Sequence, residues 1–156
     1  MRLTTYTDYA LRTLMYLAAS RERLVTIQDI ASLHGISKNH LTKVVHHLGQ
    51  VGLVATVRGR NGGLKLGAEP QDINIGAVVR MTETDFHMAE CFQPENNRCV
   101  FASACVLELA LGAATNAYLQ VLDGVTLDKL VPASHRAPID GAQPIGFRQW
   151  ERRQAG

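Results

Sequence analysis

The sequence lacks the features that would place a protein in a membrane or outside the cell. Its 156 residues contain no apolar run that approaches the roughly 20 residues of a membrane helix. Residues Met1 to Asp8 contain no apolar signal segment. We therefore expect a cytoplasmic protein without a membrane partner. Its three cysteines should stay reduced, so we expect them to act as ligands or sensors rather than to form disulfides.

The sequence also has little excess of one sign of charge, since its net charge is only +2. This small value conceals an uneven distribution along the chain. Residues 1–83 carry ten Lys/Arg and six Asp/Glu, residues 84–130 carry two and six, and residues 131–156 carry four and two. The basic first part suits a polyanionic partner, but many enzymes have such an asymmetry, so charge alone does not decide the function.

The first third of the chain has the pattern of a helix-turn-helix. Apolar residues at helical spacing predict a first helix over residues 7–19, with Thr7 or Asp8 as its cap. A Thr-x-x-Asp capping pattern that begins at Thr26 predicts the start of a second helix, and Gly35 is suited to its end. A third helix after this short turn completes the motif.

A hairpin is predicted directly after the third helix, which Ser37 is expected to cap. The β-prone segments 53–58 and 64–66 flank a Gly-rich turn that contains Asn61-Gly62, a strong hairpin signal. A hairpin at this place is the wing of a winged helix. The fold class expected is therefore mainly α with a small β-hairpin wing.

The second half of the chain contains one long apolar helix, predicted over residues 102–122. Its apolar residues cover too much of its circumference for one small domain to bury, so we expect it to pair with a second copy of itself. The alternative is burial within one subunit. The predicted parts are a winged helix-turn-helix DNA-binding domain at 1–83, a cysteine-containing loop at 84–100, a dimerisation helix and following turn at 101–131, and a disordered tail at 132–156.

The third helix and the wing carry the residues expected to bind DNA. A helix in the major groove reaches bases with its first turn, and arginines at a wing suit the negative potential of a narrow minor groove. The candidates are Ser37, Lys38, Asn39, His40, Lys43, Arg58, Arg60 and Asn61. His46 and His47 are expected beside the DNA backbone. Each Lys or Arg alone could equally be a solvated surface residue, and the whole set in this order favours DNA.

The three cysteines, Cys91, Cys99 and Cys105, lie within fifteen positions, with Cys105 expected in the first turns of the long helix. Thiolates are the usual ligands of iron–sulfur clusters, and a zinc site completed by His87 is an alternative. Three unrelated thiols are a second alternative. A cysteine hydrolase would need a base, an orienting group and an oxyanion hole. The sequence has no motif for these, so we expect no enzyme.

Three segments together resemble a known family. The motif Tyr6–Arg12, the segment Val57–Gly63 and the downstream three-cysteine loop resemble the NsrR-type nitric-oxide-sensing repressors. These belong to a winged-helix superfamily of iron–sulfur regulators that also contains the IscR-type proteins. The resemblance covers residues 1 to about 131 and leaves the tail outside.

The resemblance implies a homodimeric repressor with one iron–sulfur cluster per subunit, either 4Fe–4S or 2Fe–2S. The two-fold symmetry of such a dimer predicts a pseudo-palindromic site on duplex DNA. It implies that the three cysteines are ligands and that Asp8 of the partner subunit is the fourth. In IscR-type proteins a histidine completes the site at a position that is Glu108 here. Asp8 could instead form a helical pair with Arg12 or cap its own helix.

The implied function is a switch in which the intact cluster supports operator binding and reaction with nitric oxide releases the DNA. Two other functions use the same residues. One is an iron–sulfur regulator that senses redox state or cluster supply, and the other is a DNA-binding module stabilised by zinc.

Overall fold

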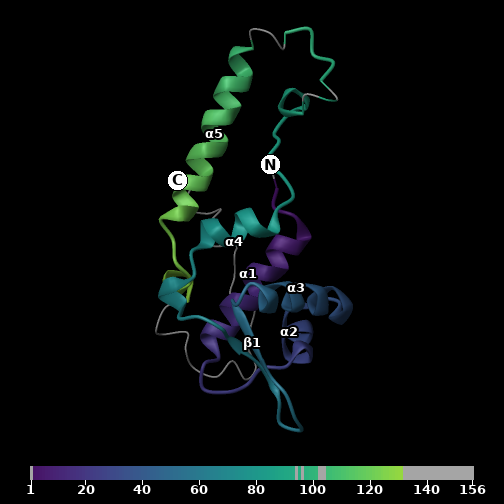
Figure 1. Cartoon of the computed structure of the whole chain (residues 1–156), viewed down its shortest axis with the longest axis vertical. Helices are drawn as coiled ribbons and strands as arrows, with labels where there is room; N and C mark the ends of the chain where they lie inside the picture. Colours follow the sequence, from purple (N-terminus) through teal and green to yellow (C-terminus); the bar gives the residue numbers. More distant parts are fainter. Residues whose placement is uncertain (1, 94, 96, 102–104, 132–156) are drawn as a thin grey trace, which may run out of the picture.

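A computed structural model describes residues 2–93, 95, 97–101 and 105–131 (Figure 1). It confirms a mainly α fold with a small hairpin. The helices are α1 (Thr5–Ala19), α2 (Ile27–His34), α3 (Lys38–Gln50), α4 (Ile75–Thr82), α5 (Val106–Asp123) and α6 (Leu127–Leu130), with single 3-10 turns η1 (Pro70–Asp72) and η2 (Glu90–Phe92). Strands β1 (Val54–Val57) and β2 (Gly63–Leu66) form the hairpin. The predicted disordered tail lies outside the described residues.

Helix α1 begins two residues earlier than the sequence pattern indicates, and its cap is Thr4 rather than Thr7 or Asp8. The Thr4 Oγ1 atom accepts a hydrogen bond from the Thr7 amide at 3.2 Å. Thr7 and Asp8 lie inside the helix, so neither occupies the N-cap position. One face of α1, which includes Ala10, Leu14 and Leu17, lies in the core and packs against α3 and α4.

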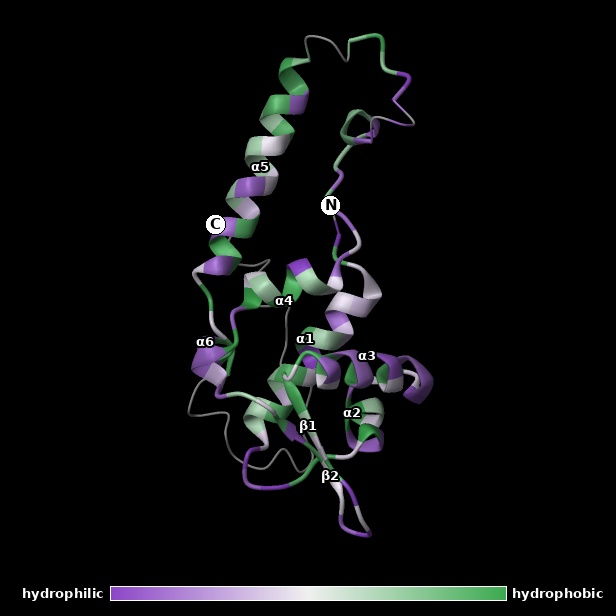
Figure 2. Ribbon diagram, in the orientation of Figure 1, coloured by the Kyte–Doolittle hydropathy of each residue, from purple (hydrophilic) through white to green (hydrophobic). Residues whose placement is uncertain are grey.

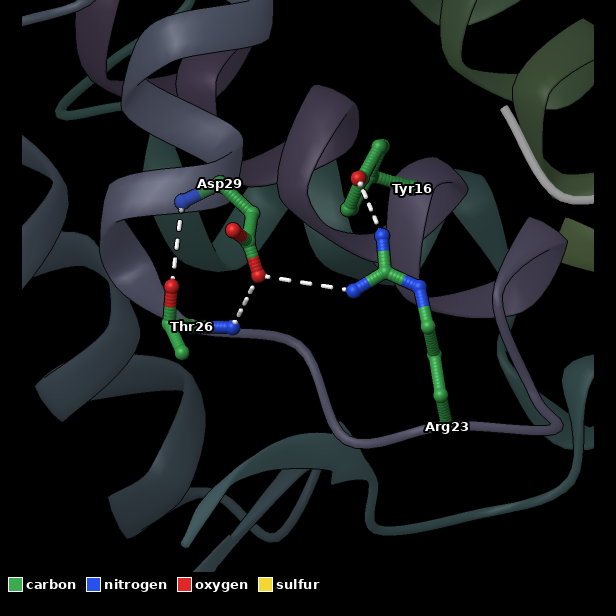
Figure 3. A network of polar contacts seen from close by, with 4 residues as sticks. All are labelled: Tyr16, Arg23, Thr26 and Asp29. Atoms are coloured by element: carbon green, nitrogen blue, oxygen red, sulfur yellow. Dashed lines mark hydrogen bonds and ion pairs between the residues drawn. The ribbon is translucent and has the colours of Figure 1, made fainter. Parts of the chain in front are cut away.

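The predicted capping box of α2 is confirmed. The Asp29 amide donates to Thr26 Oγ1 at 3.1 Å, and the Thr26 amide donates to Asp29 Oδ2 at 2.8 Å. Figure 3 shows how Arg23 joins this box to α1, through bonds to the Tyr16 hydroxyl at 3.0 Å and to Asp29 Oδ2 at 3.5 Å. The backbone hydrogen bond from Thr26 is the largest cause of the lowered pKa of Asp29. The start of α2 is thus fixed to the first helix.

The turn between α2 and α3 ends α2 at Gly35, whose φ of 63° is left-handed, as the sequence predicts. Ser37 occupies the N-cap position of α3, but its side chain makes no capping hydrogen bond. Helix α3 buries Leu41, Val44 and Leu48 against the rest of the domain. The opposite side of the same helix remains exposed.

The wing is an antiparallel hairpin in which Val54 pairs with Leu66 and Val57 pairs with Gly63. Leu64 also forms a bridge to Val25, with hydrogen bonds in both directions at 2.7 and 3.0 Å. This bridge attaches the hairpin to the connection between α1 and α2. The tip of the wing and the cysteine loop lie at opposite ends of the long axis of the molecule (Figure 1).

The C-terminal end of α5 contacts α4, and this contact, the joint, connects α5 to the winged-helix part of the chain. Arg80 on α4 donates to the carboxylate of Asp123 at the end of α5 through both terminal guanidinium nitrogens. The distance from Nη2 to Oδ2 is 2.8 Å. The Asn74 side chain donates to the Asp123 carbonyl at 2.7 Å. Gly76 is required here, because a Cβ at this position would collide with the Asp123 carboxylate. Beyond the joint α5 extends away from the core, with hydrophobic residues along its length (Figure 2).

Candidate DNA-binding and metal-binding sites

The exposed face of α3 carries the predicted DNA-binding residues in an accessible arrangement. Ser37, Lys38, Asn39, His40 and Lys43 are all exposed. Because Ser37 makes no capping bond, its hydroxyl and the first amides of α3 are free to bind an oxyanion. Among the described residues, neither lysine forms an ion pair. This face can therefore present positive charge and hydrogen-bonding groups to one ligand.

The tip of the wing presents a second exposed basic group. Arg58, Arg60 and Asn61 are exposed, and the part of the chain that the structure describes gives neither arginine an ion-pair partner. Gly59 has a φ of 121°, which residues with a side chain rarely adopt, so the tip can form its tight turn. Strand β1 starts shortly after α3 and contacts it. The third helix and the wing thus pack against each other.

Helix α1 contacts α3 through two tyrosine–histidine pairs. The Tyr6 hydroxyl lies 2.9 Å from His47 Nδ1, within hydrogen-bond distance. The rings of Tyr9 and His40 lie 6.5 Å apart between centroids. The ring of His47 is half-buried and faces α1, so less of it is exposed than the place expected beside the DNA backbone would suggest. His46 is exposed.

The cysteine loop folds back beside α5. Phe92 of η2 lies at Gly112, where an added Cβ would be 3.9 Å from its ring. Cys91 and Cys105 are half-buried, Cys99 is exposed, and all three are free thiols. Cys105 stands at the N-cap position of α5 rather than in its first turns, so the helix begins just after the predicted ligand. Residues 102–104 lie outside the described residues.

The chemistry of these thiols suits an iron–sulfur cluster, whose iron atoms bind thiolates. Desolvation is the largest cause of the raised pKa of Cys91, and the nearby charges of Glu108, Cys105 and Cys99 raise it further. The three thiols belong to one loop and to the helix start that follows it. They do not form a closed site, since no three Cys, His, Asp or Glu side chains among the described residues are placed to hold a metal ion.

His87 does not join the cysteines in the zinc arrangement considered above. Its Nδ1 lies 3.2 Å from the side-chain nitrogen Nε2 of Gln93 and 3.8 Å from Asp85 Oδ1, and its ring stacks on Phe92. The described residues therefore give zinc no fourth ligand from this histidine.

Asp8 lies on α1, far from its own subunit's cysteine loop in sequence, and forms an ion pair with Arg12 at 3.0 Å. This is the helical pair anticipated as the alternative to a ligand role. Both side chains are 43% exposed, and an exposed pair at this spacing contributes only about 0.3–0.5 kcal/mol. The pair is therefore a weak obstacle to any other use of the carboxylate.

Helix α5 exposes a continuous apolar face. Of its residues, only Thr115 is buried. Val106 is 76% exposed and Val121 is 69% exposed. The exposed apolar residues at helical spacing are Val106, Leu107, Ala110, Ala113, Ala114, Ala117 and Val121. None of the helices in the described part of the chain is long and apolar enough to cross a membrane.

Comparison with known proteins assigns the family. The model of the Rrf2 family, described as "Iron-dependent Transcriptional regulator", matches residues 3–133. The chain belongs to the Rrf2 family. It is a DNA-binding transcriptional regulator, and the prediction that it is not an enzyme is confirmed, because its relatives are named transcriptional regulators. The cysteine-hydrolase alternative is thereby removed.

Relatives within and around the Rrf2 family support the same fold. The HTH-type transcriptional regulator NsrR of Bacillus subtilis (strain 168) is 54% identical over 132 residues, which cover 84% of this chain and 90% of that protein. The structure of CymR, titled the global cysteine regulator of B. subtilis, matches with a TM-score of 0.66 at 29% identity, over 83% of this chain and 95% of that one. T. potens IscR matches with a TM-score of 0.68 at 25% identity, over 96% of both chains.

Proposed function

We propose that the chain is a nitric-oxide-responsive, iron–sulfur-dependent repressor, which binds its operator with a cluster in place and releases it after reaction with nitric oxide. The observation that carries the proposal is that one short chain joins an exposed basic recognition helix to three free thiols beside a long helix. The name of the relative that is 54% identical, and the resemblance of the sequence motifs, support the signal. A DNA-binding regulator of this kind acts in the cytoplasm.

The proposed DNA contacts divide into three kinds. Ser37 and the first amides of α3 hold a backbone phosphate, while Asn39 and His40 bond to base edges in the major groove. Lys38 and Lys43 bind guanine or phosphate. Arg58, Arg60 and Asn61 of the wing enter the minor groove, where the two guanidinium groups meet a strongly negative potential. Residues 1–83 form the DNA-binding domain in this proposal.

The proposed dimer uses the apolar face of α5, within residues 101–131. Exposed apolar residues over this length of helix favour a partner surface of the same kind. A second copy of α5 supplies such a surface, and a two-fold axis then places two α3 helices on a pseudo-palindromic site. Two recognition helices on one rigid dimer double the number of contacts made to the duplex.

The proposed cluster ligands are Cys91, Cys99 and Cys105, within and just after the loop 84–100, with the partner subunit's Asp8 as a fourth. When bound, the cluster supplies iron atoms that react with nitric oxide. Cys105 precedes the first turn of α5, and Phe92, the neighbour of Cys91, lies at Gly112 of the same helix. Because Asp8 is lightly held by Arg12, its carboxylate can leave that pair at small cost.

Metal analysis of anaerobically purified full-length protein tests the cofactor. We expect a brown protein that contains iron and acid-labile sulfide, and we expect Cys99→Ser to lose both. Arg98→Ala is the matched control in the same loop and should keep the metal content of the wild type. A colourless protein that contains zinc, or iron retained in Cys99→Ser, would contradict the proposed site.

A further inference from the structure

Glu83 connects the start of the cysteine loop to the start of α1. It is the C-cap residue of α4 and immediately precedes the loop. Its Oε1 atom accepts hydrogen bonds from the Thr4 amide at 2.8 Å and from the Thr4 hydroxyl at 3.2 Å. Thr4 is the N-cap of α1, so one carboxylate binds both the chain before the helix and the group that caps it.

The place of Glu83 suits a carboxylate for a second reason. The N-terminus of a helix carries partial positive charge, which stabilises an anion at this position. Helix α4, which Glu83 caps, contacts both α1 and α5, and desolvation, then the charge of Glu83, raise the pKa of Tyr118 on α5. The side chain of Glu83 is half-buried. It therefore stands where α1, α4 and α5 meet.

Helix α1 continues this connection to the recognition helix. Two residues after Thr4, the Tyr6 hydroxyl lies 2.9 Å from His47 of α3, and Tyr9 lies against His40 in the first turn of α3. Both tyrosines lie in the first turns of the helix whose start Glu83 holds. Glu83, the first turns of α1 and α3 are therefore joined by one short series of side-chain contacts.

We propose that Glu83 is a positioning residue that transmits the state of the cysteine loop to the recognition helix of the same subunit, through Thr4 and Tyr6. This route rests on the cluster-dependent function proposed above and adds to it a path that needs no residue of the partner.

The test compares full-length variants in the metal-free and cluster-loaded forms, with a duplex selected from a random-sequence library as the probe. The quantity is the ratio of the two dissociation constants. We expect Glu83→Ala to lower this ratio at least about fivefold with an unchanged iron content, whereas Glu83→Gln, which keeps an acceptor oxygen, retains most of it. Glu95→Ala, an exposed glutamate of the same loop, is the matched control and should not change the ratio.

A second variant shows whether the residues act in series. Tyr6→Phe removes the hydroxyl that meets His47, and it should lower the ratio as Glu83→Ala does. If the two residues share one path, the double variant is no worse than either single variant. Additive effects, or a wild-type ratio in Glu83→Ala, would overturn the proposal.

Amide hydrogen exchange of the metal-free protein separates this proposal from the proposed function. We expect Glu83→Ala to raise exchange in residues 5–9 and also in residues 44–50 of α3. If the metal-free and cluster-loaded wild-type proteins have the same dissociation constant, the cluster does not control binding. The exchange data alone then show whether Glu83 is connected to α3. Unchanged protection of α3 in Glu83→Ala overturns the proposal in either case.

Discussion

The apolar face of α5 makes a quantitative prediction about assembly. Val121 lies at the C-terminal end of this face, and 69% of its surface is exposed. In a two-fold dimer built on α5, both copies of Val121 become buried. Replacing it with glutamate removes two apolar side chains from the interface and places two carboxylates there without partners. We therefore expect Val121→Glu to weaken the dimer.

The size of this effect follows from the exposed fraction. A fully buried valine contributes about 1.5 kcal/mol, so the 69% that is exposed in one subunit contributes about 1 kcal/mol. Two copies give about 2 kcal/mol, which corresponds to about a thirtyfold weaker dimer. This is a lower bound, because burial of an unpaired carboxylate adds its own cost.

Sedimentation velocity over a range of protein concentrations measures the dimer dissociation constant. The matched control is Gln120→Glu, which adds the same charge one residue away at an exposed polar position. It should leave the dissociation constant within about threefold of the wild type, since a surface substitution usually changes stability by less than about 0.5 kcal/mol. A wild-type protein that is monomeric at micromolar concentration, or a Val121→Glu dimer as tight as the control, would refute α5 as the dimer interface.

Three further predictions concern DNA binding, stability and pH. Arg60→Ala should lower the slope of log affinity against log salt by about 2, one phosphate for each subunit, measured by fluorescence anisotropy. Thr26→Ala should lower the free energy of unfolding in urea by about 1 kcal/mol, because the α2 capping box loses its hydroxyl. His34→Phe should reduce the loss of melting temperature between about pH 7.5 and pH 5.5, since desolvation, then the charge of Arg12, lower the pKa of His34 in the fold.

The sign of the pH effect follows from proton uptake. With a folded pKa below the ordinary value, the unfolded chain binds a proton at His34 first, so stability is lost as pH falls through the ordinary histidine range. Within the described residues the buried Nε2 atom of His34 has no hydrogen-bond partner. Replacement by phenylalanine therefore breaks no hydrogen bond of this atom. An equal loss in wild type and His34→Phe would exclude this histidine as the cause.

Controls for the other two variants come from the same chain. Arg21→Ala, which removes an arginine paired with Glu69, should keep the wild-type salt slope. Thr26→Ser keeps the capping hydroxyl and should stay within about 0.5 kcal/mol of the wild type. An unchanged slope in Arg60→Ala would remove the wing from the interface. Thr26→Ala as stable as Thr26→Ser would show that the box adds nothing.

The sequence was sufficient where local chemistry determines the structure. The capping box at Thr26, the left-handed Gly35 and the hairpin each depend on residues only a few positions apart, although the left-handed residue of the hairpin turn is Gly59 rather than Asn61 or Gly62. Helix-turn-helix and wing could therefore be predicted with nearly correct bounds. The exposed apolar face of α5 was likewise visible as a helical pattern too wide to be buried in one subunit.

Features that depend on distant residues were missed for a physical reason. The start of α1 is held by Glu83, which is 79 positions away, and His47 is drawn toward Tyr6 across 41 positions. Periodicity carries no information about such contacts. The cysteine loop has little regular structure, so spacing could indicate ligands of a metal but could not place Cys105 just before α5.

In the proposed function, nitric oxide controls the affinity of the dimer for its operator DNA. The direct measurement adds nitric oxide, without oxygen, to the cluster-loaded dimer bound to a fluorescent copy of the selected duplex. We predict that the dissociation constant rises at least about tenfold as the visible absorption of the cluster changes, which is a coupling of about 1.4 kcal/mol. Metal-free protein treated in the same way should show no change. An unchanged affinity in the loaded protein, with its absorption altered, would contradict the account.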